Sequence, residues 1–146
     1  MGLDMYLTAR QFIWSKDRKT IKITGVKSDV PKGFDVETIV CEAIYWRKSN
    51  AIHKWFVETC QEGKDDCGSY YVSHLKLKEL LALVTKALDN RDKAEDILPT
   101  TSGFFFGGTD YDEWYWDDLV QTKKELTEVL KAFDDKHWEF QYHSSW

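Results

Sequence analysis

The chain has 146 residues, with 20 Lys and Arg against 25 Asp and Glu, so its formal net charge is −5. This length predicts one compact domain spanning residues 1–146, because domains usually have about 100 to 150 residues. The hydrophobic content of 42% is ordinary for a globular protein and excludes disordered, collagen-like and disulfide-scaffold classes. The acidic balance argues against general nucleic-acid binding, which needs a basic surface.

The amino-terminal residues give no sign of export. Asp4 stands where a secretory signal would have a positive charge, no apolar run follows it, and Tyr6 occupies the position where myristoylation needs Ser or Thr. The cysteines, Cys41, Cys60 and Cys67, are odd in number, which favours free thiols in a reducing compartment. We therefore expect a cytoplasmic protein with no membrane segment.

Period-2 alternation of apolar and polar residues predicts two early strands, over residues 3–8 and 21–24. Proline and glycine then place a loop over residues 28–34. The stretch 38–46 is rich in β-branched side chains, which favours a strand over a helix.

Apolar residues at three- and four-residue spacing follow. Ser49 is expected to cap a helix that ends near residues 61–63, and Ser73 a second helix whose apolar stripe runs from Leu77 to Leu88. This second helix has the most regular stripe of the chain.

The carboxy-terminal third predicts one more helix between two strands. A short apolar strand over 104–106 is followed by a long helix, which starts at a Thr109 cap and ends near Asp134. Alternation over 138–142 predicts a closing strand. The fold class expected is α+β, with a mostly antiparallel sheet packed by about three helices.

Metal and cofactor chemistry finds little support. His53, Cys60, Cys67 and His74 follow one another at seven-residue intervals. Seven residues of helix rise about 10.5 Å, so His53 and Cys60 could not reach the same zinc ion. No P-loop, dinucleotide fingerprint or nucleophile elbow occurs. We expect no metal and no cofactor.

One aromatic and cationic stretch, residues 45–53, has the inventory of a site for a nucleotide-like anion. Aromatic faces can stack on a base, Arg and Lys can pair with phosphate, and Asn and His can direct hydrogen bonds. The alternative, with Trp46 in the core and the cations in water, stays open. The candidate ligand-binding residues, completed from the region 104–115, are Tyr45, Trp46, Arg47, Lys48, Asn50, His53, Phe106, Tyr111 and Trp114.

Several motifs carry a family resemblance: MGLDMYL at 1–7, YWRKSNAIHKWFV at 45–57, GFFFG at 103–107, YDEWY at 111–115 and SSW at 144–146. With them the sequence resembles a family of small proteins of unknown function encoded by bacteriophages and prophages. The resemblance implies a phage setting, in the cytoplasm of an infected bacterial host. Small accessory proteins often counter host defence there.

The leading hypothesis is a phage accessory protein that binds a small nucleotide-like ligand, without turning it over, and so sequesters a host defence signal. Residues 61–146 hold ten basic and eighteen acidic groups, net 10 − 18 = −8. This charge suggests an alternative, an acidic inhibitor directed at a host defence nuclease, as anti-CRISPR proteins are. A second alternative is a small phosphodiester-acting enzyme with His53 as its base. Exposed aromatic residues would favour a homodimer.

Overall fold

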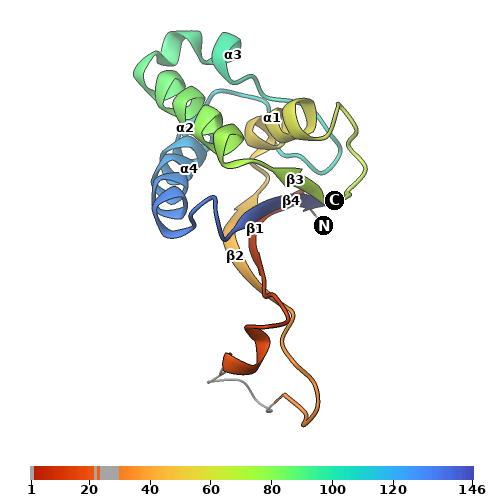
Figure 1. The fold of residues 1–146 in the computed structure, drawn as a ribbon. Coiled ribbons are helices and arrows are strands. Elements are labelled where there is room, and N and C mark those ends of the chain that lie inside the picture. Colours follow the sequence, from red (N-terminus) through yellow and green to blue (C-terminus); the bar gives the residue numbers. More distant parts are fainter. Residues whose placement is uncertain (1, 22, 24–29) are drawn as a thin grey trace.

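The computed structural model describes residues 2–21, 23 and 30–146, and in this part of the chain four strands form one open sheet (Figure 1). The strands are β1 (Asp4–Phe12), β2 (Thr38–Arg47), β3 (Tyr70–Val72) and β4 (Glu139–Ser145). They lie in the order β2-β1-β4-β3, and each neighbouring pair is antiparallel. The α+β class with an antiparallel sheet is therefore confirmed.

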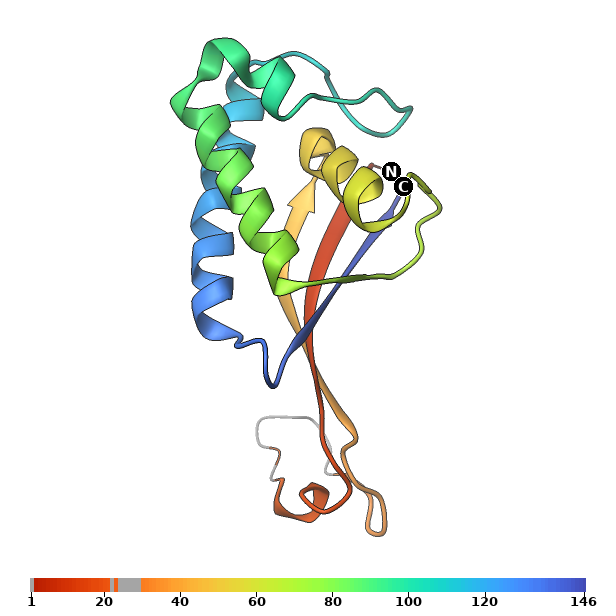
Figure 2. The ribbon, with the colours of Figure 1, turned by 45° about the horizontal axis from the view of Figure 1, so that its top comes forward.

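Helices occupy one side of this sheet (Figure 2). Among the described residues they are α1 (Asn50–Cys60), α2 (His74–Asp89), α3 (Ala94–Ile97) and α4 (Glu113–Ala132), with 3₁₀ turns η1 (Arg18–Thr20) and η2 (Arg91–Lys93). The three helices expected from the sequence correspond to α1, α2 and α4. The single turn α3 was not expected, because four residues are too few to show a helical period.

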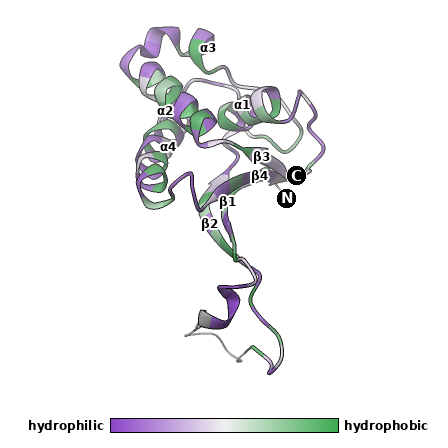
Figure 3. Ribbon diagram, in the orientation of Figure 1, coloured by the Kyte–Doolittle hydropathy of each residue, from purple (hydrophilic) through white to green (hydrophobic). Residues whose placement is uncertain are grey.

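Strand alternation separates the two faces of the sheet. Leu3, Met5 and Leu7 are fully buried under the helices, whereas Tyr6 and Thr8 on the opposite face are half-buried. The helices α2 and α4 pack side by side, and in Figure 3 hydrophobic and hydrophilic residues alternate along both of them. Their inner stripes close the core, as an amphipathic helix over a sheet requires.

Side-chain caps are present at the starts of α2 and α4 but not at the start of α1. The Ser73 side chain accepts a hydrogen bond from the Lys76 N–H and caps α2, as expected. Ser49 precedes α1 but makes no capping bond there. The predicted Thr109 cap is wrong: α4 begins later, and the Asp112 carboxylate accepts from the Tyr115 N–H at 3.3 Å. Asp and Thr are both good caps, so local sequence did not separate them.

The strand predicted over 104–106 is wrong, and the strand predicted over 21–24 lies partly outside the described residues. Residues 104–106 form a turn in which the Phe106 N–H donates to the Gly103 carbonyl at 3.1 Å. Ile21 and Ile23 lie in no strand, and residues 22 and 24 fall outside the described part. A strand needs a paired neighbour. The Phe105 carbonyl accepts from the Leu3 N–H at 3.0 Å, but this contact belongs to none of the strand pairings of the sheet.

The strands β1 and β2 run on beyond the rest of the sheet. Their pairing continues to Phe12 and Thr38, whereas β4 pairs with β1 only as far as Arg10. The strands β1 and β2 therefore project from the helical layer as a two-stranded ribbon (Figures 1 and 2). The base of this ribbon borders the largest cavity described below.

Candidate functional site

A cleft of about 350 Å³ lies where the end of β2 meets the start of α4. Three of the nine candidate residues line it: Arg47 at the end of β2, Lys48 directly after it, and Trp114 in the first turn of α4. The full lining is Arg47, Lys48, Gly107, Gly108, Asp112, Trp114 and Asp118. The two segments expected to share a pocket, 45–53 and 104–115, meet here only in part: the first contributes Arg47 and Lys48, and the second contributes residues between Gly107 and Trp114.

Lys48 stands at the sharp turn from β2 into α1 and has a left-handed backbone, with φ 57°. Its N–H donates to the Leu3 carbonyl at 2.7 Å, and its own carbonyl accepts from the Asn50 N–H at 2.9 Å. These bonds hold a conformation that costs a non-glycine residue roughly 1 kcal/mol or more. Lys48 forms no ion pair with any described carboxylate, although Asp112 and Asp118 line the same cleft.

Asn50 does not line the cleft, but it is bonded to the loop that contributes Gly107 and Gly108 to the lining. Its Nδ2 donates to the Phe106 carbonyl at 3.0 Å and to the Gly108 carbonyl at 2.8 Å. Its Oδ1 accepts from the Thr101 N–H at 3.1 Å. The buried amide thus joins the first turn of α1 to the loop that holds Gly107 and Gly108. Its donor and acceptor groups are bonded to the protein, so they are not free to bind a ligand.

His53 lies in the interior, with 1% of its surface exposed. Its Nε2 is 2.9 Å from Asp65 Oδ2 and its Nδ1 is 2.7 Å from the Tyr142 hydroxyl. An ionised carboxylate only accepts, so Nε2 donates to Asp65, and in the neutral imidazole Nδ1 then accepts from the hydroxyl. Burial raises the pKa of Tyr142 well above its usual value, which keeps that hydroxyl a donor. Both ring nitrogens are engaged inside the protein.

Trp46 and Arg47 point to opposite faces of β2. Trp46 is 4% exposed, and its Nε1 donates to Thr122 Oγ1 at 2.9 Å, so it belongs to the core. Arg47 is exposed, and its Nη1 lies 3.0 Å from Asp4 Oδ1. The Tyr45 hydroxyl donates to the same carboxylate, and this bond raises the pKa of Tyr45.

Phe106 and Tyr111 support the cleft from behind. Phe106 is buried and meets the His53 ring edge to face, with 5.1 Å between the centroids. The Tyr111 hydroxyl accepts from the Thr100 N–H at 3.2 Å, and its ring packs against Tyr115 at 4.9 Å. Neither residue is part of the cleft lining.

Sequence reasoning missed Asp118 as a site residue. Burial raises the pKa of its carboxyl to about 6; the Ser49 hydroxyl lowers it, and the charges of Asp117 and Asp112 raise it further. Acidic residues at the start of a helix are typical of capping, which Asp112 performs and Asp118 does not. The sequence does contain one indication of this. Asp118 stands next to Leu119 of the apolar stripe of α4, where burial partly removes the carboxylate from water.

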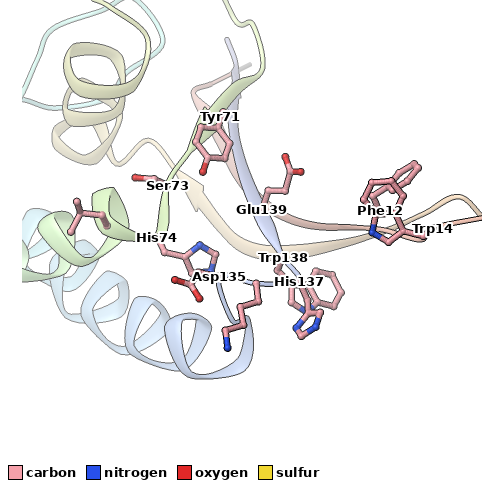
Figure 4. Close-up of a pocket in the computed structure, with 11 residues that line it drawn as sticks. Phe12, Trp14, Tyr71, Ser73, His74, Asp135, His137, Trp138 and Glu139 are labelled. Atoms are coloured by element: carbon pink, nitrogen blue, oxygen red, sulfur yellow. The ribbon is translucent and has the colours of Figure 1, made fainter. Parts of the chain in front are cut away.

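A larger cavity, of about 640 Å³, lies at the base of the β1–β2 ribbon (Figure 4). Its side chains come from the end of β1, from the β3–α2 junction and from the loop before β4. They include Trp14, Tyr71 and His74, whose Nε2 donates to the Phe133 carbonyl at 2.9 Å. No motif predicted this cavity, because its three segments are far apart in the sequence. Its mixture of one lysine, two carboxylates and two imidazoles selects no single ligand charge.

Within the described ranges, no group of three or more His, Cys, Asp or Glu side chains lies close enough to hold a metal ion. No helix there is long and apolar enough to cross a membrane.

Searches against protein-family models, curated proteins and solved structures gave no match. The resemblance to phage-encoded proteins therefore stays a prediction from the motifs.

Proposed function

We propose that the protein binds a small nucleotide-like ligand in the cleft of Arg47, Lys48 and Trp114. The observation that carries the proposal is the meeting of two cations and an exposed aromatic ring, from distant segments, around one cavity. The volume of about 350 Å³ lies at the lower end of the range of small-molecule sites, about 300 to 1,000 Å³.

Each part of the cleft matches one part of such a ligand. The Trp114 side chain is 80% exposed, so its ring can stack on a base, which is worth about 1–3 kcal/mol. Arg47 offers a planar fork for a phosphate, and Lys48 adds a second positive charge. Gly107 and Gly108 have no side chains that would narrow the entrance.

The carboxylates narrow the choice of base. Asp112 and Asp118 line the same cleft and accept hydrogen bonds when ionised. Guanine offers two adjacent N–H donors to a carboxylate, whereas adenine offers only its amino group at that edge. A guanine nucleotide with a phosphodiester therefore suits the lining best.

Capture without turnover is favoured over phosphodiester hydrolysis. His53, the base that such an enzyme would use, is sealed inside and bonded at both ring nitrogens. Capture of a host defence signal during phage infection is the biological role that we attach to this binding. That role rests on the family resemblance and not on the cleft.

The acidic-inhibitor alternative has less support. The carboxylates Asp112, Asp117 and Asp118 lie at the start of α4, but Lys123 and Lys124 follow in the next turn of the helix. A mimic of nucleic acid needs an extended run of negative charge. The helix interrupts such a run after about two turns.

Calorimetric titration with cyclic GMP, cyclic AMP and ADP-ribose tests the proposal. We expect saturable binding of cyclic GMP, weakened about tenfold or more by Trp114→Ala. Tyr71→Ala is the matched control, since Tyr71 is an exposed aromatic outside the cleft. No heat with any of the three ligands, or unchanged affinity in Trp114→Ala and Arg47→Ala, would falsify the proposal.

A further inference from the structure

A second surface feature lies on the helical layer, independent of the cleft. A shallow groove of about 620 Å³ runs along the outer side of α4 and the end of α2. Its floor is apolar: Leu88 is half-buried and the Val120 side chain is 53% exposed. Four cations, Arg91, Lys123, Lys124 and Lys131, surround this floor, with Glu128 as the one carboxylate in the lining.

The groove is straight because its α4 residues share one helix face. Val120, Lys123, Lys124, Thr127 and Lys131 stand at offsets of 0, 3, 4, 7 and 11 along α4. Such offsets return to the same side of a helix, and eleven residues span about 16 Å. The groove therefore has the length of roughly three helical turns.

None of the four cations of the groove forms an ion pair with a described carboxylate. The Arg91 guanidinium lies over the Trp116 ring at 4.7 Å, which holds it in position. Four cations against the single carboxylate of Glu128 give the groove a net positive charge, which attracts an anionic partner. The chain as a whole carries −5, so this surface has the opposite sign to the molecule.

We propose that this groove docks an acidic amphipathic helix of a partner protein. An apolar stripe on such a helix would cover Leu88 and Val120, while its flanking carboxylates would pair with the lysines. A nucleic-acid backbone would satisfy the cations but would leave Val120 exposed, because a chain of phosphates offers no apolar face. The charge and the floor together therefore favour a peptide.

Fluorescence anisotropy with designed peptides tests this docking. The probe is a labelled peptide of about 18 residues with Leu at helical 3–4 spacing and Glu on the other face. Its control has the same composition with the leucines distributed around the helix. We expect the patterned peptide to bind at least about tenfold more tightly than the control. Equal binding of the two peptides, no binding, or preferred binding of an oligothymidylate overturns the proposal.

Protein variants locate the site. The double change Lys124→Glu and Lys131→Glu should weaken the patterned peptide about tenfold or more, and Val120→Ser should weaken it while preserving the charge. Lys78→Glu is the matched control, because Lys78 is an exposed lysine of α2 outside the groove. Thermal melts of each variant verify folding. Affinity that is unchanged in the double variant, or lost equally in Lys78→Glu, counts against the groove.

Discussion

Gly107 and Lys48 lie against each other across the cleft, both with left-handed backbones. Their φ angles are 81° and 57°, and a Cβ built on Gly107 would lie 3.5 Å from the Lys48 Cβ. Glycine adopts a positive φ without strain, whereas a lysine at such an angle is strained. The cleft is thus shaped by two tight turns, of which one is strained.

Because Lys48 is strained, replacing it should change the stability of the protein and its affinity for the ligand in opposite directions. Lys48→Gly should raise the free energy of unfolding by about 0.5–1 kcal/mol, because glycine adopts a positive φ without cost. The same change removes a cation from the cleft and should weaken cyclic GMP binding. Urea denaturation and calorimetry on one preparation measure both quantities. A fall in both stability and affinity would mean that the lysine side chain supports the fold.

Gly107→Ala should act in the opposite direction. An alanine at φ 81° is strained, so we expect a loss of about 1 kcal/mol or more. Gly33→Ala, at φ 90° with no atom within 4 Å of the added Cβ, measures the backbone cost alone. The added Cβ at Gly107 lies 3.5 Å from Lys48, an ordinary van der Waals contact, so the two losses should be similar; a Gly107 variant that loses no stability would contradict a strained backbone.

Asp118 should make the protein less stable as pH rises. Its pKa of about 6 exceeds the ordinary 3.8, so the folded state binds this proton more tightly than the unfolded state. The stabilisation is present at low pH and is lost as pH rises from about 4 through 6. Asp118→Asn should therefore raise stability near pH 8 by about 1 kcal/mol, a value discounted for the water-facing part of the carboxyl.

Melting temperatures between about pH 4 and pH 8 test this, since the difference between Asp118→Asn and wild type should vanish at the acid end. A constant difference across the range contradicts a raised pKa. Asp110→Asn is the control, as Asp110 is an exposed carboxylate that is not among the charges raising the pKa of Asp118.

The Tyr142 hydroxyl should matter for stability although its ring does most of the packing. Tyr142→Phe keeps the stack on Phe56, with centroids 3.9 Å apart, but leaves His53 Nδ1 buried without its donor. We expect a loss of about 1–3 kcal/mol. Tyr45→Phe removes a hydroxyl bond that faces water, and it should cost only a few tenths of a kcal/mol. Equal costs in urea denaturation would contradict this account.

Asn50→Asp should disrupt the loop that contributes Gly107 and Gly108 to the cleft. The carboxylate can still accept from the Thr101 N–H, but it would face the carbonyl oxygens of Phe106 and Gly108. A buried charge beside two acceptors should cost about 3 kcal/mol or more at neutral pH. The loss should shrink in acid as the carboxyl is protonated, which a pH series of denaturation curves would detect.

Local patterns in the sequence were enough to predict most of the regular structure. The stripe from Leu77 to Leu88 and the alternation at Leu3, Met5 and Leu7 reflect burial of one face, and the structure has a helix and a strand there. Such patterns work because each residue's environment repeats with the period of its own element. The inventory of Arg47, Lys48 and Trp114 could likewise be read from the sequence.

Tertiary structure alone decided which candidate side chains reach a cavity. In β2, Trp46 faces the core while Arg47 faces outward, and only the pairing of β2 with β1 determines that choice. Asn50 and His53 form hydrogen bonds with residues far along the chain. The sequence around them therefore does not show that their polar groups are bonded inside the protein. The meeting of Lys48 with Gly107, and the desolvation of Asp118, depend on contacts between distant segments, for which sequence spacing carries no distance information.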